Sequence, residues 1–241
     1  MKIRSLLTIA TLCLTSLINE LHAKVTSQET IQLRQSYPSL LEDIQKKRLA
    51  LHQRLQSRQH TRKAVITESR EYLIDTLRQK IFPAWYGTPW DFNGTSQVPG
   101  EGKIACGYFV STSLTHLGYK VNRFRLAQQP SQRIIETFMP KSQRTILKSQ
   151  APIANVSTFL KSKGNGIYIV GLDRHVGFIS VDGDHLDFIH SSCYSPSLVV
   201  SEPINSKNPL RDSKYRVIGK LFSDEMVLSW LAQKSYSVKT R

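Results

Sequence analysis

Three residues of this chain have the types and order needed for nucleophilic catalysis: Cys106, His175 and His190. A thiol nucleophile needs a base in contact with it and a third group that holds the base in orientation. Cys106 follows a glycine-rich loop and opens a helical pattern. Free amides at a helix start favour a thiolate and can bind the oxyanion of an attacked carbonyl. These features predict covalent catalysis by a cysteine.

A predicted β-hairpin brings the two histidines together. The segment Val181-Asp182-Gly183-Asp184 separates two apolar runs, and Asp-Gly is a favoured two-residue turn. With that turn His175 faces His190, and directly opposed residues have Cβ atoms about 4.5–5.5 Å apart on one face of the sheet. A four-residue loop keeps both histidines on one face, whereas a three-residue loop separates them.

The same hairpin is rich enough in His and Asp for a metal site to be a competing interpretation. In the predicted register Asp187 faces Phe178, and it shares with His185 the face opposite to His175 and His190, so the ligands are split. We therefore expect neither a metal nor a cofactor. Three further histidines lie in helical patterns and are expected at the surface: His52, His60 and His116.

The elements around these residues indicate an α+β fold. Helical spacing covers residues 40–55, 67–81, 106–117, 130–138 and 153–163, and Ser223 is placed to begin a last helix. Apolar runs predict antiparallel strands at 167–172, 176–181 and 186–189, with further candidates at 198–200 and 215–221. Helices precede strands, so the helix of the nucleophile is expected to pack on an antiparallel sheet.

Three motifs occur in order along residues 67–222. They read Gly87-Thr88-Pro89-Trp90, then Ala105-Cys106-Gly107-Tyr108-Phe109-Val110, and finally His175-Val176-Gly177-Phe178 with a second strand ending in His190-Ser191-Ser192. They resemble the motifs of the NlpC-like papain-fold cysteine peptidases of bacterial cell walls. In that family the cysteine segment is Asp-Cys-Ser-Gly-Phe-Val and the second strand ends in His-Ala-Ser.

The resemblance implies a papain-like fold with Cys106 as nucleophile, His175 as general base and His190 as the orienting residue. It places Trp90 and Phe92 at the substrate, although Phe92 stands where the family often has a tyrosine. The implied activity is hydrolysis of an amide bond in peptidoglycan stem peptides, by an endopeptidase or an amidase. The alternative is a cell-wall-binding or scaffolding module that keeps the fold without turnover.

The first 23 residues have the three-part pattern of a secretory signal peptide. Lys2 and Arg4 precede an apolar run over residues 6–17, and Ala23 offers a cleavage position. The run is too short to span a membrane comfortably, so we expect export to the periplasm or beyond and no transmembrane segment in the mature chain. Cys106 and Cys193 remain after cleavage. In an oxidising compartment a disulfide between them is the alternative to a free catalytic thiol.

The 241 residues carry a net charge of +15, and removal of residues 1–23 leaves +14. Such a charge implies an anionic partner. Export argues against nucleic acid and in favour of peptidoglycan and other anionic envelope polymers. Between the signal and a hydrolase domain over 67–241 lies a basic helical region, 24–66, in which Lys46 to Lys63 hold seven positive charges and no acid. This stretch is either a solvated helix face or a docking surface for such polymers.

Overall fold

The computed structural model describes residues 28–57, 61–148 and 151–240. The predicted signal peptide lies outside these residues. Six strands in the described ranges form one antiparallel sheet in the order β1-β6-β2-β3-β4-β5, which confirms the α+β class. The strands are β1 (Arg144–Lys148), β2 (Gly166–Leu172), β3 (Val176–Asp182), β4 (His185–Ser191), β5 (Val199–Pro203) and β6 (Tyr215–Lys220).

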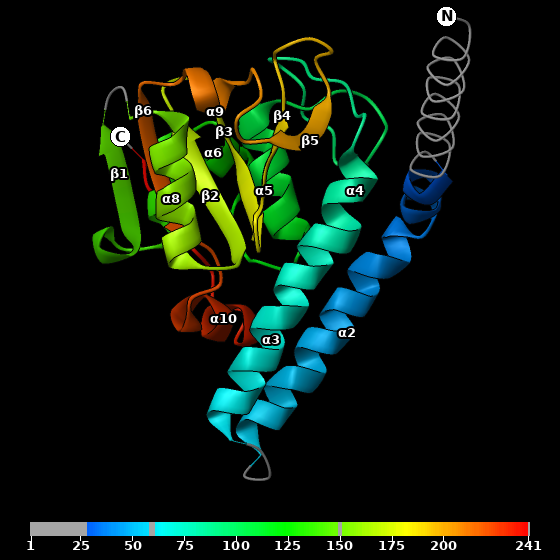
Figure 1. Ribbon diagram of the computed structural model, residues 1–241. Helices are drawn as coiled ribbons and strands as arrows, with labels where there is room; N and C mark the ends of the chain where they lie inside the picture. The colour runs from blue at the N-terminus through cyan, green and yellow to red at the C-terminus, as the bar shows by residue number, and fades with distance from the viewer. Residues whose placement is uncertain (1–27, 58–60, 149–150, 241) are drawn as a thin grey trace, which may run out of the picture.

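Helices cover both faces of this sheet (Figure 1). On one face α5 (Cys106–His116) and α7 (Ser131–Phe138) pack on β2, β3 and β4, over buried side chains such as Phe109 and Phe178. On the other face α8 (Ile153–Lys163) covers a smaller cluster that includes Leu160 and Phe188. Short helices complete the domain: α6 (Arg123–Ala127), α9 (Pro209–Asp212) and α10 (Asp224–Leu231).

A long helical hairpin runs along one side of the sheet domain and projects beyond it (Figure 1). It consists of α2 (Tyr37–Gln56) and α3 (Arg62–Thr76), and α3 continues through one π-helical turn, Leu77–Ile81, into α4 (Phe82–Trp85). Its buried leucines belong to the same hydrophobic cluster as those of α5. The expected boundary at residue 66 therefore lies inside α3. None of the described helices is long and apolar enough to cross a membrane.

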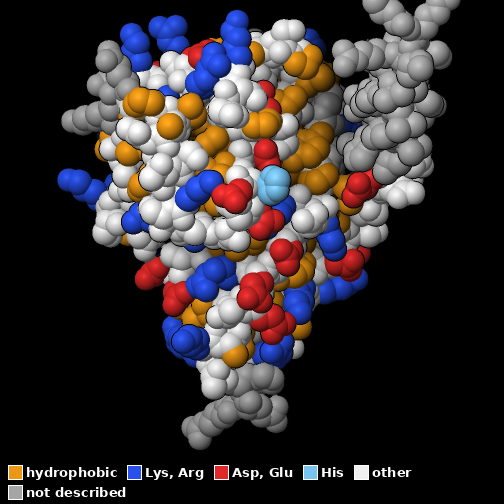
Figure 2. All heavy atoms as spheres, in the orientation of Figure 1, with side chains coloured by type: hydrophobic (Ala, Val, Ile, Leu, Met, Phe, Trp, Pro, Cys, Tyr) orange, Lys and Arg blue, Asp and Glu red, His pale blue; other side chains and the backbone are white. Residues whose placement is uncertain are grey.

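The hairpin carries positive and negative side chains side by side, as Figure 2 shows over α2 and α3. Lys47 and Arg54 both pair with Glu68 on the facing helix, and Lys46 pairs with Asp43 one turn away. Several of the cations counted in the sequence are therefore paired within the fold.

Most element predictions are confirmed within a residue or two, but the register of the β3–β4 hairpin is not. Ile179 pairs with Phe188 and Asp182 pairs with His185, so the turn is Gly183-Asp184 instead of Asp182-Gly183. The reason is local, because Gly183 has a φ of 59° and stands at the first turn position, where type II′ turns favour glycine. The shift moves pairing by two residues, so His175 and His190 keep their common face.

Candidate active site

Cys106 is the first residue of α5, and the loop before it is held by backbone hydrogen bonds. The Ile104 amide donates to the Pro89 carbonyl and the Ala105 amide to the Gly94 carbonyl, both at 2.9 Å. Ala105 is the N-cap residue and offers no side-chain acceptor to the first amides of the helix. Those amides have no partner within the helix. They are therefore available to the cysteine sulfur and to a bound oxyanion.

The surroundings of the Cys106 thiol oppose its ionisation. Burial raises the pKa of Cys106, and backbone N–H groups of Val176 and Gly107 act in the opposite direction without outweighing it. The helix start was expected to favour a thiolate, and the structure corrects this expectation. The cost of removing the charge from water exceeds what the nearby amides return. Cys106 therefore rests as a neutral thiol.

A chain of three hydrogen-bonded side chains lies beside this thiol. His175 Nε2 is 2.8 Å from His190 Nδ1, and His190 Nε2 is 2.9 Å from a carboxylate oxygen of Glu202. His175 is 6% exposed and His190 is fully buried. The N–H of Val176, directly after His175, points at the Cys106 sulfur. The structure thus brings the three predicted catalytic positions together and adds Glu202 behind them.

The order of acceptors and donors in this chain fixes both imidazole tautomers. An ionised Glu202 carboxylate can only accept, so His190 Nε2 carries a proton and donates it. A neutral His190 then has a lone pair on Nδ1, which accepts from the N–H at His175 Nε2. A neutral His175 in that tautomer has a lone pair on Nδ1. Glu202 thereby makes the remaining nitrogen of His175 a base.

Both imidazoles are held neutral. Burial, followed by the neighbouring His190, lowers the pKa of His175 well below its ordinary value. Burial also lowers the pKa of His190, against the opposing effect of Glu202. The ring of His190 stacks on Phe188 with centroids 4.0 Å apart. Gly177 leaves room for it, since a Cβ at position 177 would come within 2.9 Å of the His190 Cβ.

Glu202 was missed from the sequence because it lies on β5, which was predicted only as residues 198–200. In the structure β5 pairs Phe188 with Glu202 and His190 with Val200. The carboxylate therefore reaches His190 diagonally, from the same face of the sheet. A strand extended by two residues past Val200 would have placed Glu202 on the same face as Val200, and the pairing of β5 with β4 sets that face beside His190.

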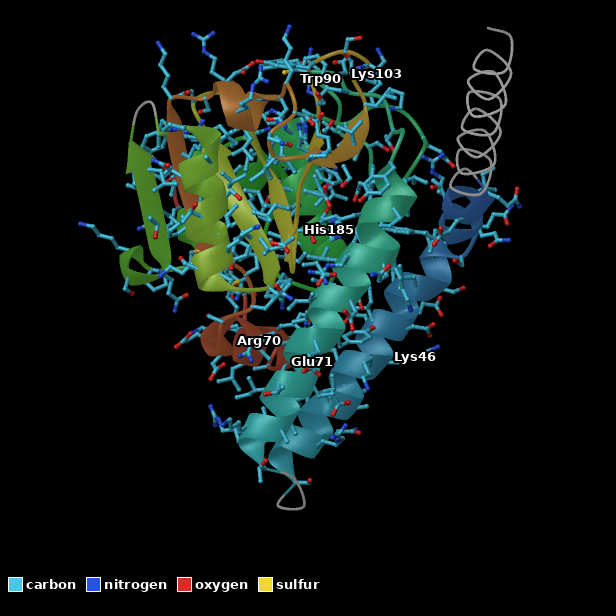
Figure 3. All side chains as sticks on the ribbon, viewed as in Figure 1. Lys46, Arg70, Glu71, Trp90, Lys103 and His185 are labelled. Carbon is cyan, nitrogen blue, oxygen red and sulfur yellow. The ribbon has the colours of Figure 1, made fainter. Side chains whose placement is uncertain are left out.

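Two cavities of about 560 Å³ each meet at Cys106 and His175 and together form a groove. One half is aromatic, with Trp90, Phe92 and Tyr108 in its wall. The other half is lined by amide side chains, among them Gln129 and Gln132. The two predicted substrate-contacting residues thus lie in the same half-groove as the nucleophile. Phe92 is 79% exposed, and Figure 3 shows Trp90 at the end of the molecule away from α10.

Gly107, the residue after the nucleophile, stands where the backbone of α6 comes close to α5. A Cβ at Gly107 would lie 2.3 Å from the carbonyl oxygen of Ala127, so only glycine allows the end of α6 to approach the nucleophile this closely. Ala127 in turn lines both halves of the groove. The glycine therefore shapes the groove next to Cys106.

Cys193 lies in the wall of the aromatic half-groove and is exposed, and both it and Cys106 are free thiols. The structure therefore shows the free-thiol alternative and not the disulfide.

His116 was expected at the surface, but it is partly buried on α5 and its Nδ1 is 3.0 Å from the Tyr37 hydroxyl of α2. Burial lowers the pKa of His116 to about 4. His52 is also partly buried, and His60 lies outside the described residues.

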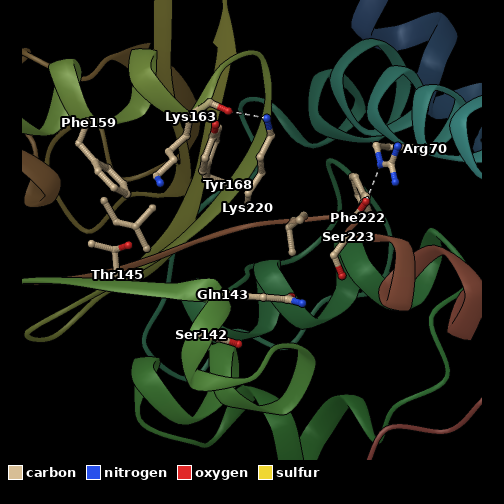
Figure 4. A pocket seen from close by; sticks show the side chains of 12 residues that line it. Arg70, Ser142, Gln143, Thr145, Phe159, Lys163, Tyr168, Lys220, Phe222 and Ser223 are labelled. Carbon is tan, nitrogen blue, oxygen red and sulfur yellow. Dashed lines mark hydrogen bonds between the residues drawn. The ribbon is translucent and has the colours of Figure 1, made fainter.

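A cavity of about 540 Å³ lies at the other end of the sheet, between α8, β6 and the start of α10 (Figure 4). Two of the three cationic side chains in its described lining, Arg70 and Lys220, donate to backbone carbonyls. Lys220 donates to the Lys163 carbonyl and Arg70 donates to the Phe222 carbonyl, both at 2.8 Å, and Arg70 also pairs with Asp224. These contacts join α8, α3 and α10 to the sheet, whereas the Lys163 amine lies over the Phe159 ring, 5.7 Å from its centre.

Within the described residues there is no group of three or more His, Cys, Asp or Glu side chains that could hold a metal ion. The hairpin residues His185 and Asp187 point away from the His175–His190 pair, as alternation requires. Comparison of the chain with protein-family models, curated proteins and solved structures found no match. The chemistry of the site therefore rests on its geometry.

Proposed function

We propose that the protein is a thiol hydrolase that cleaves an amide bond with Cys106 as nucleophile and His175 as base. The observation that carries this proposal is the hydrogen-bonded chain from Glu202 through His190 to His175, which ends beside a cysteine at an uncapped helix start. A nucleophile, a base, an orienting partner and oxyanion donors are the parts that acyl transfer requires.

The two resting neutral groups define the first step. His175 Nδ1 takes the proton of the Cys106 thiol as the sulfur bonds to the carbonyl carbon, and the amides at the start of α5 hold the oxyanion. The C–N bond then breaks, and His175 gives the proton to the leaving amine. Water attacks the thioester with His175 again as base, and the proton returns to the sulfur as the acid product leaves. His190 and Glu202 keep the tautomer throughout.

We infer a substrate in the peptides of bacterial cell walls, and a papain-like arrangement, from the resemblance of the cysteine and histidine motifs. The net charge of +15 supports this inference, since wall polymers rich in carboxylates and phosphates would be concentrated near a basic protein. The experiment is incubation with purified muropeptides, read by mass spectrometry. We expect new fragments with the wild type and with Cys193→Ser, and none with Cys106→Ala. Equal product profiles for wild type and Cys106→Ala would contradict the proposed substrate.

The competing proposal is a wall-binding or scaffolding module without turnover, for which the strong positive charge of the chain would suffice. A module of this kind would sediment with intact wall sacculi in a salt-sensitive manner while cleaving no muropeptide. Turnover that depends on Cys106 would exclude it.

Export is part of the proposal because the substrate lies outside the cytoplasm. The mass of the mature protein recovered from cell fractions tests it. We expect a species that lacks residues 1–23 in the exported fraction. A full-length chain retained in the cytoplasm would separate the hydrolase from its proposed substrate.

A further inference from the structure

We propose that Arg174 forms an anion-binding subsite in the groove, so that the substrate carries a carboxylate close to the amide bond that is cleaved. This inference rests on the proposed function and adds a substrate class to it. Arg174 directly precedes His175 in the chain. It occupies a two-residue turn between β2 and β3, closed by the Leu172 amide donating to the His175 carbonyl at 2.8 Å.

The turn separates its two charged side chains. Asp173 accepts from the Ser213 hydroxyl and from the Lys214 amide, each at 2.8 Å, and is thereby held against the segment before β6. Arg174 is exposed and lines both halves of the groove. Among the described residues, no salt bridge or side-chain hydrogen bond engages its guanidinium. The turn therefore presents one free cation to the groove.

The walls of the groove contain little that could neutralise this cation. The described lining of the aromatic half includes no acidic side chain, and that of the amide half includes only the engaged Asp173. A guanidinium with five donors matches a carboxylate, which it can bind through two parallel hydrogen bonds. A cationic group beside the scissile amide would instead be repelled. The chemistry points to a carboxylate-bearing amide.

Alkylation of Cys106 tests the subsite without any turnover. Iodoacetate and iodoacetamide form the same thioether bond to sulfur and release iodide, but only iodoacetate carries a negative charge. We would measure the ratio of their rate constants at pH 8 in the full chain with Cys193→Ser, so that Cys106 is the thiol followed by mass spectrometry. We expect Arg174→Ala to lower the iodoacetate-to-iodoacetamide ratio about three- to tenfold, and Arg174→Lys to retain most of it.

The matched control is Arg62→Ala, which removes the same charge from an exposed position at the start of α3. It should leave the ratio within about 1.5-fold, while 0.5 M NaCl should lower the wild-type ratio because salt screens exposed charges. An unchanged ratio in Arg174→Ala, or an equal fall in Arg62→Ala, would overturn the subsite.

A binding measurement covers the case in which Cys106 resists alkylation, which would count against the hydrolase and not against the subsite. Calorimetric titration of Cys106→Ala with N-acetylglutamate should show binding that its neutral diamide lacks. Adding Arg174→Ala should weaken that binding at least fivefold. Equal affinity with and without Arg174 would contradict the inference even if muropeptides are cleaved.

Discussion

The two ends of the sheet hold cavities of similar size but opposite character. At the end where β3 begins, the groove contains the thiol, the His175–His190–Glu202 chain and a free arginine. At the other end, in the cavity of Figure 4, Lys220 and Arg70 donate to the Lys163 and Phe222 carbonyls.

The difference lies in where the polar groups are directed. At the far end they terminate helices and join elements, so their hydrogen bonds stabilise the fold. At the near end each group leaves the next one with an unused donor or acceptor, and the last group, His175, lines the groove together with Cys106. A cavity volume alone does not distinguish the two ends, but the direction of the hydrogen bonds does.

The largest expected difference between the ends concerns the base. His175→Ala should lower kcat/KM for amide hydrolysis about 10³-fold, because general base catalysis typically contributes 10²–10⁴. Lys220→Ala at the far end should change it less than twofold. Both are measured on the substrate that the muropeptide experiment identifies. Comparable losses in the two variants would mean that the ends are not functionally distinct.

The next effect concerns the tautomer. Glu202→Gln puts an amide beside His190 Nε2 that can donate as well as accept, so the tautomers of both histidines are no longer fixed. We expect kcat to fall about 10²-fold with KM nearly unchanged, since a positioning group acts on the chemical step. Glu225→Gln is the matched control, because Glu225 accepts from Gln143 at the far end. A loss that appears in KM alone would remove Glu202 from the proposed role.

These two positions also show how far the sequence predicts the site. Local signals suffice for Cys106 and for the common face of the histidines, because the face depends only on the parity of the hairpin register. The register itself was wrong, since either Asp182-Gly183 or Gly183-Asp184 makes an acceptable turn. The position of Glu202 depends on the pairing of β4 with β5, and the β1 strand depends on pairing with β6, far away in the chain. Periodicity within a segment carries no information about such pairing.

The direction in which the pKa of a side chain is shifted is the other property that the sequence did not predict. A cysteine at a helix start suggested a lowered pKa, but the sign is decided by burial under α6 and β3, which belongs to the tertiary structure. The same holds for His116, which is partly buried against α2 of the helical hairpin, where the Tyr37 hydroxyl contacts its ring. Helix patterns located both residues correctly and said nothing of what packs over them.

A glycine substitution at each end sharpens the comparison further. In Gly177→Ala the new Cβ would lie 2.7 Å from a Phe188 ring carbon, so the support of His190 must move. We expect a loss of about 1–3 kcal/mol in the free energy of unfolding, as for other overpacked cores, together with about a tenfold loss in kcat.

The matched substitution at the far end is Gly164→Ala. Its new Cβ would meet only the Lys220 amine, at 3.9 Å, but the backbone of Gly164 has a φ of 77°. It should cost about 1 kcal/mol through backbone strain and leave kcat unchanged. Thermal unfolding and initial rates separate the two.

Acid should destabilise the protein through its buried neutral histidines. Burial lowers the pKa of His116 from 6.5 to about 4, so the unfolded chain binds more protons than the folded one between these values. The contribution is therefore fully present above pH 6.5 and is lost as the pH falls towards 4, which amounts to about 2 kcal/mol between pH 7 and pH 5. Urea unfolding at both pH values should show a smaller pH dependence for His116→Gln. The pH dependence of the unfolding free energy that remains in this variant includes the contribution of His175 and His190, whose pKa values are also lowered. An unchanged pH dependence in the variant would place the effect elsewhere.

The smallest expected effect tests whether the far cavity is purely structural. Lys220 reaches two carbonyls at the end of α8, those of Lys163 and Gly164, and its amine lies 5.5 Å from the centre of the Tyr168 ring. Lys220→Met keeps an unbranched side chain over Tyr168 and removes the donors, so it should lower the free energy of unfolding by about 0.5–1.5 kcal/mol. Denaturant unfolding measures this loss, and rates at saturating substrate should stay at the wild-type value. A fall in rate without a fall in stability would mean that the far cavity affects catalysis in the groove. The direction of the hydrogen bonds at the two ends would then no longer distinguish a structural cavity from a catalytic one.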